Sequence, residues 1–465
     1  MIQVEKLRLT YAEKDAPALV VDQLQIAKGE CVVLCGKSGS GKTSFLRLLN
    51  GLIPEYDYGV IEGHAAIGTL VAGQQTVEDF AEQVGTVFQN PATQFFHRLA
   101  SEELVFGCEN QGVAIEEIER RLKATNALLE LESLLDLDLL QASGGQRQKI
   151  AIGAALMQQP QILLLDEPTA NLDQIGIQQV TQALTQLKEV GYTILIAEHR
   201  LHFLMELADR FLYFDQGVLT EQWTASQFAQ LTTAERQALG LRALNLTSVH
   251  QQLQSKIATT SVGLDGVQLV QLAIGYDRTI AEIADYTFPS GMITGITGPN
   301  GIGKSTLLLT LAGLISVKSG KIKFQGQFPT RRTLQQQTAY VMQDVRLQLV
   351  ANSVAQELHL GTIETEHYEQ VLTELNLRHL LDAHPLTLSG GEQQRLMIAH
   401  ARLSQKAVYL FDEPTSGLDF EQMQHVQHLL QQLKAMGKVV IVISHDEEFL
   451  AESCDRIFQM TNYHE

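Results

Sequence analysis

The residues Gly36-Lys37-Ser38-Gly39-Ser40-Gly41-Lys42-Thr43 lie between an apolar run at 31–35 and a stretch of helical apolar spacing at 44–52. They fit the pattern G-x-x-x-x-G-K-[ST], in which glycines let the backbone fold around a phosphate group so that its N–H groups point at the anion. The N-terminus of the following helix adds partial positive charge. The residues Gly298 to Ser305 repeat the pattern, between a strand-like run at 292–296 and a helical stretch at 306–314. The sequence therefore predicts two phosphate-binding loops.

Each loop carries a lysine and a hydroxyl that suit a nucleotide. Lys42 or Lys304 would reach the β- and γ-phosphates, and the hydroxyl that follows the lysine would hold Mg²⁺. A single glycine-rich loop could be an ordinary turn, but two loops, each with the partner residues described below, argue against that alternative. The predicted nucleotide-binding residues are Gly36, Ser38, Gly39, Gly41, Lys42, Thr43 and Ser44 in the first loop, and Gly298, Asn300, Gly301, Gly303, Lys304, Ser305 and Thr306 in the second.

The residues that carry chemistry recur in the same order in two halves of the chain. From Ser143 and Ser389 onward the two halves keep a constant offset of 246 residues, whereas the first half has extra residues before that point. Such self-similarity indicates one structural unit written twice. We predict domains at 1–232 and 265–465, joined by a helical tail and linker at 233–264. The corresponding pairs are Gln89 and Gln343, Ser143 and Ser389, Asp166 and Asp412, and His199 and His445.

Composition and charge restrict the class of function. The 465 residues include 34 Lys and Arg against 53 Asp and Glu, and the net charge of −19 argues against broad electrostatic binding to nucleic acid or anionic lipid. No apolar stretch approaches the roughly 20 residues that span a bilayer, and the N-terminus lacks the apolar core of a signal peptide, so any membrane role would be by docking. The four cysteines show no C-x-x-C spacing and are expected to be buried or incidental thiols.

Two apolar runs end in paired carboxylates, Asp166-Glu167 and Asp412-Glu413. A strand buried in a parallel sheet is apolar along its whole length, and ligands bind at the carboxyl end of such strands. The aspartate of each pair suits the Mg²⁺ hydration shell, and the glutamate can polarise the water that attacks the γ-phosphorus. The alternative, a pair of helix-capping acids, is disfavoured by the phosphate loop upstream.

His199 and His445 each follow another strand-like run, and each lies 33 residues after the aspartate of its half. A lone histidine would more often be structural, but the identical spacing favours a donor that contacts the γ-phosphate. The variable middle regions predict helices at 102–106, 115–135 and 367–381. The histidines of the variable regions, His64, His97, His359 and His384, are expected to be surface or hydrogen-bonded side chains rather than metal ligands.

These motifs together resemble two ATP-binding-cassette ATPase domains in tandem, over nearly the whole chain. The most specific element is the signature loop, Ser143-Gly144-Gly145-Gln146 in one half and Ser389-Gly390-Gly391-Glu392 in the other. The resemblance implies an α/β fold of two tandem P-loop domains, each with a mainly parallel sheet core, an antiparallel β part and a helical subdomain. It also implies that the two cassettes pair, so that the signature loop of one caps ATP held by the other.

The resemblance assigns roles residue by residue. The catalytic residues would be Glu167, Glu413, His199, His445, Gln89 and Gln343, and the Mg²⁺ ligands would be Thr43, Gln89, Asp166, Ser305, Gln343 and Asp412. The first site would be completed by Ser389 and Gly391, and the second by Ser143 and Gly145. Asn171-Leu172-Asp173 and Gly417-Leu418-Asp419 match the loop that crosses between the sites.

Three departures or additions accompany this assignment. Tyr11 and Tyr276, each placed just after the first strand of its half, would stack on adenine, the alternative being an ordinary edge-strand aromatic. Ala142 stands where the family usually has leucine, and Lys149 stands where the second half has an arginine. Neither departure removes a catalytic group, so both sites are expected to be competent.

The segment Phe88-Gln89-Asn90-Pro91-Ala92-Thr93-Gln94 resembles the glutamine-loop region of energy-coupling-factor ATPases, although acidic residues usually stand where Ala92 and Thr93 lie. The segments 51–54 and 197–200 also resemble double-domain members of that group. The resemblance implies a peripheral ATPase at the cytoplasmic face of the cell membrane. It would dock through the glutamine loop on an integral scaffold protein that works with a small substrate-binding membrane protein, and its cargo would be a vitamin or a precursor. Alternatively, Phe95 and Phe96 simply pack the helical subdomain.

Two other functions share these motifs. A soluble twin-cassette translation factor on the ribosome usually carries a long charged linker, whereas residues 232–263 are short and hold four charges. A fused sugar-importer ATPase commonly has one degraded site, whereas both halves here keep their catalytic residues. The sequence therefore favours an importer ATPase that uses ATP and Mg²⁺ and binds no nucleic acid.

Overall fold

A computed structural model describes residues 1–12, 14–170, 172–257, 265–361 and 367–461. The chain divides into two compact units, Met1–Leu244 and Asn245–Glu465. Each unit carries one phosphate loop and one set of the motifs that follow it, and the two are described separately below.

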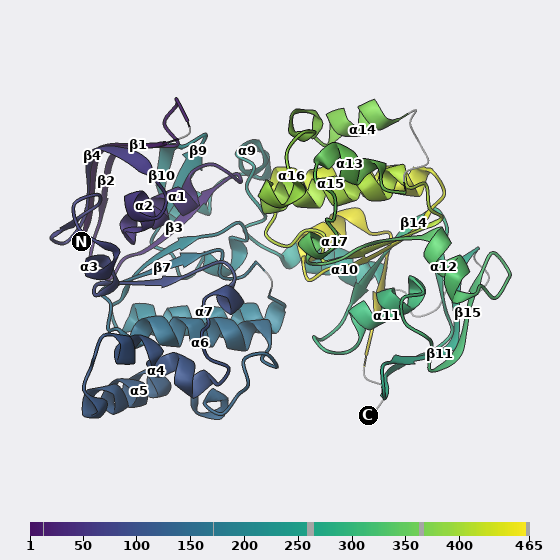
Figure 1. The fold of residues 1–465 in the computed structure, drawn as a ribbon, viewed down its shortest axis with the longest axis horizontal. Coiled ribbons are helices and arrows are strands. Elements are labelled where there is room, and N and C mark those ends of the chain that lie inside the picture. The colour runs from purple at the N-terminus through teal and green to yellow at the C-terminus, as the bar shows by residue number, and fades with distance from the viewer. Residues whose placement is uncertain (13, 171, 258–264, 362–366, 462–465) are drawn as a thin grey trace. The chain divides into compact units, whose positions relative to one another are not determined.

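The first unit is built on a mixed sheet that, within the described residues, has ten strands in the order β5-β4-β1-β2-β10-β9-β3-β8-β7-β6 (Figure 1). The strands from β9 to β6 run parallel, and β1, β2, β4 and β5 form an antiparallel part. The strands are β1 (Ile2–Tyr11), β2 (Leu19–Ile26), β3 (Cys31–Gly36), β4 (Gly59–Ile67), β5 (Leu70–Val71), β6 (Val84–Val87), β7 (Ile162–Asp166), β8 (Thr193–Ala197), β9 (Arg210–Asp215) and β10 (Val218–Thr224).

The second unit repeats the parallel part strand for strand. Its five-stranded sheet has the order β16-β17-β18-β14-β19 and is parallel throughout, and a separate antiparallel sheet pairs β11 with β12, β13 and β15. This confirms the predicted α/β cassette architecture in both halves. The strands are β11 (Gly266–Gly275), β12 (Thr279–Ile283), β13 (Tyr286–Pro289), β14 (Met292–Thr297), β15 (Ser319–Phe324), β16 (Thr338–Val341), β17 (Val408–Asp412), β18 (Val439–Ile443) and β19 (Arg456–Gln459).

Helices cover both faces of each parallel sheet, and α4 and α5 lie beside α6 as a helical subdomain, away from β7 (Figure 1). In the first unit the helices are α1 (Lys42–Leu49), α2 (Leu52–Glu55), α3 (Val77–Ala81), α4 (Ala100–Asn110), α5 (Ile115–Leu129), α6 (Gly144–Met157), α7 (Gln174–Glu189), α8 (Ala225–Phe228) and α9 (Thr233–Ala238). In the second unit they are α10 (Thr247–Lys256), α11 (Lys304–Leu311), α12 (Arg331–Gln337), α13 (Val354–His359), α14 (Tyr368–Glu374), α15 (Gly390–Leu403), α16 (Phe420–Ala435) and α17 (Glu447–Ser453).

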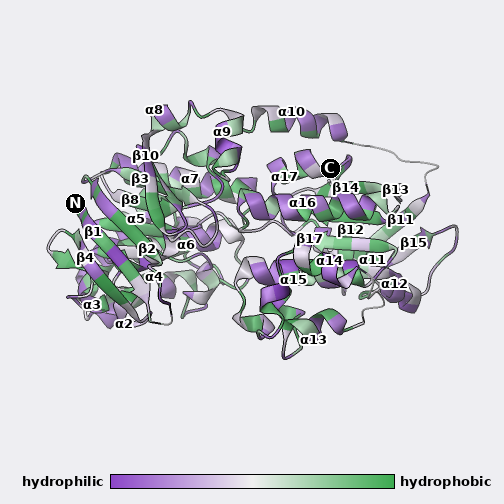
Figure 2. Ribbon diagram, turned by 90° about the horizontal axis from the view of Figure 1, so that it is seen from above, coloured by the Kyte–Doolittle hydropathy of each residue, from purple (hydrophilic) through white to green (hydrophobic). Residues whose placement is uncertain are grey.

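The central strands are apolar along their length because each contributes to two cores. On β7, Ile162 and Leu164 pack with the residues of α1, whereas Leu163 and Leu165 pack with those of α6 and α7. The strand β17 alternates in the same way between the α11 side and the side of α15 and α16. Figure 2 shows the result as predominantly green strands, with more purple on α10 and α16. The carboxyl ends of these strands are thereby held rigidly where the acidic pairs begin.

Two predicted helices are shorter in the structure. The stretch 115–135 forms α5 only to Leu129, because Glu130 takes a left-handed conformation with φ of 52° and ends the helix. A short 3-10 turn, η2 (Glu132–Leu134), follows. In the stretch 367–381, α14 ends at Glu374 and a 3-10 turn, η5 (Arg378–Leu380), comes after the left-handed Asn376. Apolar periodicity continues across such breaks and did not reveal them.

The residues between the cassettes pack on the units they adjoin. After α9, the Leu239 carbonyl accepts a hydrogen bond from the Tyr213 hydroxyl at 2.8 Å. In the second unit, α10 lies against α17, and Lys256 Nζ donates to the carbonyls of Ala451 and Cys454. Residues 258–264 of the expected linker lie outside the described part of the chain.

Candidate nucleotide site

The first phosphate loop leaves β3 through Gly36 and enters α1 at Lys42. Gly36 has φ of 139°, and a Cβ there would lie 2.2 Å from the Phe214 carbonyl oxygen of β9, so the close approach of two backbones requires glycine. Lys42 is buried, and its Nζ donates to the carbonyls of Gly36 and Lys37, both at 2.9 Å. The ammonium group is thus held inside the loop whose N–H groups would surround a phosphate.

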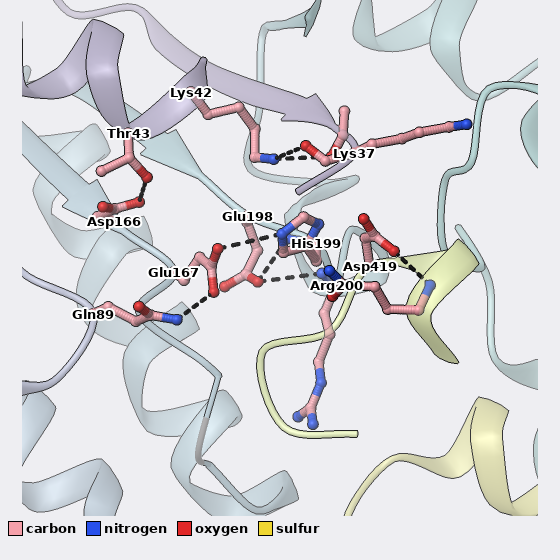
Figure 3. A network of polar contacts seen from close by, with 12 residues as sticks. Lys37, Lys42, Thr43, Gln89, Asp166, Glu167, Glu198, His199, Arg200 and Asp419 are labelled. Carbon is pink, nitrogen blue, oxygen red and sulfur yellow. Dashed lines mark hydrogen bonds and ion pairs between the residues drawn. The ribbon is translucent and has the colours of Figure 1, made fainter. Parts of the chain in front are cut away.

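Five predicted side chains converge at the carboxyl edge of the first sheet (Figure 3). Thr43 Oγ1 donates to Asp166 Oδ1 at 3.1 Å. Glu167 is contacted on one oxygen by Gln89 Nε2 at 2.7 Å and on the other by His199 Nε2 at 3.2 Å. The loops after β6, β7 and β8 therefore meet at one glutamate.

Thr43, Glu167 and His199 line a cavity of about 550 Å³, a volume in the usual range for small-molecule sites. Tyr11 lies at this cavity, and its hydroxyl shares a hydrogen bond with Ser44 Oγ at 2.8 Å. Its stacking on adenine stays a prediction. The predicted residues that line the cavity are Tyr11, Ser38, Gly39, Gly41, Lys42, Thr43, Ser44, Glu167 and His199.

Both glutamates occupy an unusual backbone conformation that the sequence did not predict. Glu167 has φ of 46° and Glu413 has φ of 50°, in the left-handed region that non-glycine residues rarely adopt. Each backbone N–H still donates to the neighbouring strand, at Ala197 O in the first unit and Ile443 O in the second. The turn aims the glutamate side chain away from the strand axis without breaking the sheet.

Electrostatic effects shift the pKa values of the two acids of the first pair in opposite directions. Burial, together with the adjacent charge of Glu167, raises the pKa of Asp166 to about 6. Burial alone would also raise the pKa of Glu167, but the charges of His199 and Lys42 and the hydrogen bonds from His199 and Gln89 outweigh it and lower that pKa. Glu167 therefore remains ionised at neutral pH, as a residue that accepts a proton must be.

The second cassette assembles the corresponding residues with different contacts. Lys304 Nζ donates to the carbonyls of Gly298 and Pro299 at 2.8 and 3.0 Å. Burial raises the pKa of Asp412, while hydrogen bonds from Ser305 and Tyr340 act in the opposite direction.

The second histidine lies beside the phosphate loop and the acidic pair, and its backbone N–H donates to Glu413 Oε2 at 3.0 Å. His445 Nε2 lies 2.9 Å from Asn300 Oδ1 of the phosphate loop and 3.5 Å from Glu413 Oε1. Gln343 and Tyr276 are exposed, so their predicted roles remain predictions.

The signature loops begin the long helices α6 and α15 with reciprocal caps. Ser143 Oγ accepts from the N–H of Gln146, whose side chain accepts from the Ser143 N–H. Ser389 and Glu392 form the same capping box. At Gly145 a Cβ would lie 2.5 Å from Gln179 Oε1 on α7, which explains the small residue there. The capping role of the fourth signature residue was not predicted.

Two buried glutamates in the helical subdomains were also missed. Glu103 Oε2 accepts from the N–H groups of Phe96 and His97, and Glu357 Oε2 accepts from those of Val350 and Ala351. Each glutamate lies 14 residues after the glutamine of its half. That constant spacing was a usable signal, since the repeat otherwise diverges in this region.

Several other predictions concern residues outside this site. All four cysteines are buried and free. Among the residues described, no group of three or more His, Cys, Asp or Glu side chains is placed to hold a metal ion, and the roles expected of the histidines in the variable regions stay predictions. Asn171 of the loop 171–173 lies outside the described part of the chain. Phe95 packs against the core, as one alternative proposed, but Phe96 is 77% exposed.

The fold of both units is that of ATP-binding cassettes. The chain belongs to the ABC transporter family, whose model matches residues 21–170 and 282–416. A "Putative ABC transporter ATP-binding protein" of Treponema denticola is 37% identical over 463 residues, which cover 98% of this chain and 94% of the relative. The "Putative HMP/thiamine import ATP-binding protein YkoD" of Bacillus subtilis is 30% identical, over 98% of this chain and 89% of the relative.

A solved structure of an "RNase-L Inhibitor" matches with a TM-score of 0.65 at 24% identity, over 98% of this chain and 88% of that one. This likeness shows the shared two-cassette fold and says nothing about which molecules this chain binds. Within the described residues, no helix combines the length and apolar character needed to cross a bilayer.

Proposed function

We propose that the chain is the ATP-hydrolysing motor subunit of a membrane importer of the energy-coupling-factor type. The observation that carries the proposal is a pair of exposed apolar patches at matching positions of the two helical subdomains. Each lies directly after a glutamine loop, where a partner could sense the state of the ATP site. The proposal rests on these patches, on the duplicated sites and on the transporter relatives.

The patches consist of residues that correspond in the repeat. Phe96 and Leu140 are 77% and 73% exposed in the first subdomain, and their counterparts Val350 and Leu386 are 75% and 54% exposed in the second. The two segments of the first patch are adjacent, since Leu139 N donates to Arg98 O at 2.8 Å. Solvent exposure of large apolar side chains at two equivalent places is typical of an interaction surface.

Short segments of the chain connect each exposed patch to the predicted ATP site. Glu103 and Glu357 pin the loop that carries Phe96 or Val350, as described above. The predicted catalytic glutamine lies seven residues before Phe96 in the first half and seven before Val350 in the second. In the first half, this glutamine, Gln89, contacts Glu167 at 2.7 Å. Movement of Gln89 with the nucleotide would therefore shift the docking loop, and a partner held there would feel the ATP state.

Hydrolysis would be performed by this chain's own groups. Glu167 and Glu413 would accept a proton from the attacking water, while Lys42 and Lys304 would bind the phosphate oxygens. Lys42 must exchange its two carbonyl contacts for phosphate, so the loop is poised to respond to binding. His199 and His445 would donate to the γ-phosphate and hold the glutamate in place. The signature residues Ser143, Gly145, Ser389 and Gly391 would complete the nucleotide contacts.

The oxygen groups at each loop fit a magnesium ion. Thr43, Asp166 and Gln89 would hold it in the first cassette, and Ser305, Asp412 and Gln343 in the second, which is the hard-oxygen donor set that Mg²⁺ prefers. When bound, the ion would neutralise charge on the β- and γ-phosphates. The elevated pKa of Asp166 is consistent with a carboxylate whose usual neighbour is a cation.

A vitamin or a vitamin precursor is the proposed cargo. The relative from Bacillus subtilis carries thiamine import in its name, and the cargo pocket would lie on the small membrane partner rather than on this chain. The paired cassettes would thus act at the cytoplasmic face of the membrane without contacting the cargo.

The proposal is tested by recovering the tagged protein from its native cells in mild detergent and identifying its partners by mass spectrometry. We expect a polytopic scaffold and a small integral membrane protein. The double substitution Phe96→Glu with Leu140→Glu should remove both partners while ATP binding and the melting temperature stay near the wild-type values. Recovery of ribosomal proteins without any membrane protein would overturn the proposal.

A matched control is offered by another repeated pair of exposed apolar residues. Val190 and Met436 are 58% and 54% exposed after the ends of α7 and α16. Val190→Glu should leave the membrane partners bound. Equal loss of partners with Val190→Glu would show that any added surface charge disrupts the complex, and the patches would then carry no specific role.

A further inference from the structure

A buried carboxylate with no assigned role lies next to the first histidine. Glu198 follows β8, its side chain is 2% exposed, and it accepts four hydrogen bonds. Its Oε2 accepts from the N–H and the hydroxyl of Thr169 at 3.2 and 2.7 Å. Its Oε1 accepts from the N–H groups of His199 and Arg200 at 2.8 and 3.2 Å.

These four bonds join two loops that the sheet alone would leave independent. Thr169 belongs to the turn that begins with Glu167 after β7. His199 belongs to the loop after β8, where Figure 3 shows it beside Glu198. Arg200 adds a second connection, because its NH1 donates to the Leu172 carbonyl at 3.3 Å. Thr169 and Arg200 are themselves buried, at 0% and 9% exposure.

A buried carboxylate is costly to keep unless donors surround it, and here every donor comes from the two loops. Burial and the nearby charge of Glu167 raise the pKa of Glu198. The four hydrogen bonds therefore stabilise the buried Glu198 carboxylate, whereas its burial and the nearby charge of Glu167 disfavour it. If either loop moved away, the carboxylate would lose the donors that compensate its burial.

In the second cassette, shorter polar residues stand at the positions of Glu198 and Arg200. Ser444 stands at the position of Glu198, and its hydroxyl shares a long 3.4 Å contact with Thr415 and accepts from the Asp446 N–H at 3.1 Å. Asp446, at the position of Arg200, caps α17 by accepting from the Phe449 N–H at 3.1 Å. There the histidine loop is joined to the acidic pair directly, because the His445 N–H donates to Glu413 Oε2 at 3.0 Å.

We infer that Glu198 is a positioning residue of the first ATP site, which fixes the loop of His199 against the turn of Glu167 so that the two side chains meet. This inference rests on the proposed ATP hydrolysis. In the first cassette the link is a buried carboxylate, whereas in the second the His445 N–H donates directly to Glu413 Oε2 at 3.0 Å. Misplacing a catalytic group by about 1 Å can cost up to a hundredfold in rate, so the link should be visible in turnover rather than in ATP binding.

The test uses the full-length protein with one site silenced at a time. In a Glu413→Gln background, where the first cassette keeps its own glutamate, Glu198→Gln places an amide group against two of the four donors. We expect single-turnover hydrolysis to slow by roughly tenfold, with the Kd for ATP within twofold and the melting temperature within a few degrees. The matched control, Ser444→Ala in a Glu167→Gln background, should slow hydrolysis less than twofold.

A second, milder variant tests the same link in case Glu198→Gln disturbs folding. Thr169→Val keeps the shape of the side chain and removes one donor, so it should slow hydrolysis by roughly threefold in the same background, unlike Thr415→Val in the second cassette. A rate unchanged by Glu198→Gln, or a loss of ATP binding in parallel with rate, would overturn the inference while leaving the proposed function standing. A wild-type protein that does not hydrolyse Mg-ATP would overturn both.

Discussion

The two cassettes keep the same predicted catalytic residues but hold them by different contacts. In the first, Glu167 is contacted by both Gln89 and His199, and Glu198 links the two loops behind them. In the second, the His445 ring contacts Asn300 of the phosphate loop and its N–H donates to Glu413, while the shorter Ser444 stands in place of the linking carboxylate. The strand order of the parallel sheet is nevertheless the same. The comparison teaches that the sheet specifies where the predicted catalytic groups lie, whereas a few loop residues decide which contacts hold them.

The largest expected effect comes from removing both glutamates. Glu167→Gln with Glu413→Gln should lower ATP turnover by about 10²- to 10⁴-fold, because each loses the group that accepts a proton from water. ATP binding, measured with a fluorescent analogue, should remain intact. Turnover near the wild-type rate would contradict the assignment of these bases. The single variants then report the rate of each cassette separately and sharpen the comparison.

The buried aspartates should differ in how they affect stability with pH. The pKa of Asp166 rises from 3.8 to about 6 on folding, so the folded protein binds the proton more tightly than the unfolded chain. The stability that this group contributes therefore falls as pH rises from about 4 to 6, and its full cost is present above pH 6.

Asp166→Asn removes that cost. In EDTA it should raise the melting temperature of the nucleotide-free protein by roughly 2–6 °C at pH 7.5, and by less at pH 4.5. Asp412→Asn should show the same sign with a smaller rise, since Ser305 and Tyr340 already offset its burial. A lower melting temperature for Asp166→Asn at pH 7.5 would contradict the electrostatic account.

A smaller difference should appear at the tyrosine that contacts the second aspartate. The Tyr340 hydroxyl donates to Asp412 Oδ2 at 3.2 Å, whereas the corresponding Thr86 accepts from Asn50 Nδ2. Tyr340→Phe should raise the Mg²⁺ concentration needed for half-maximal ATP binding to the second cassette by roughly threefold to tenfold, because a hydrogen bond to a charged group is lost. Thr86→Val should leave the Mg²⁺ requirement unchanged, and equal shifts in the two variants would argue against this role.

The smallest effect is expected at the signature serines. Ser143→Ala or Ser389→Ala removes a helix cap worth about 1 kcal/mol, so hydrogen exchange at the first amides of α6 or α15 should accelerate by roughly fivefold. The change should be larger for Ser389, whose hydroxyl also donates to the Glu392 carboxylate at 2.7 Å. Equal acceleration in both helices would show that this extra bond contributes little.

Much of the site was readable from the sequence because its spacing is constrained by the sheet. The loop Gly36–Thr43 follows β3, Asp166 ends β7 and His199 follows β8, and parallel strands bring their carboxyl ends to one edge. A motif that must meet another at such an edge keeps its place in the repeat, which is why the offset of 246 residues holds from the signature loop onward.

The sequence by itself thus determined the two-cassette organisation, the strands that lead into the motifs and the residues proposed for each site. Only the tertiary structure decided the left-handed turns at Glu167 and Glu413, the end of α5 at Glu130 and the four donors around Glu198. These features depend on contacts between segments that are distant in the chain, and such contacts leave no local periodicity. A buried glutamate and an exposed one look the same in the sequence. They differ in which backbone N–H groups the fold brings within hydrogen-bond distance of the carboxylate.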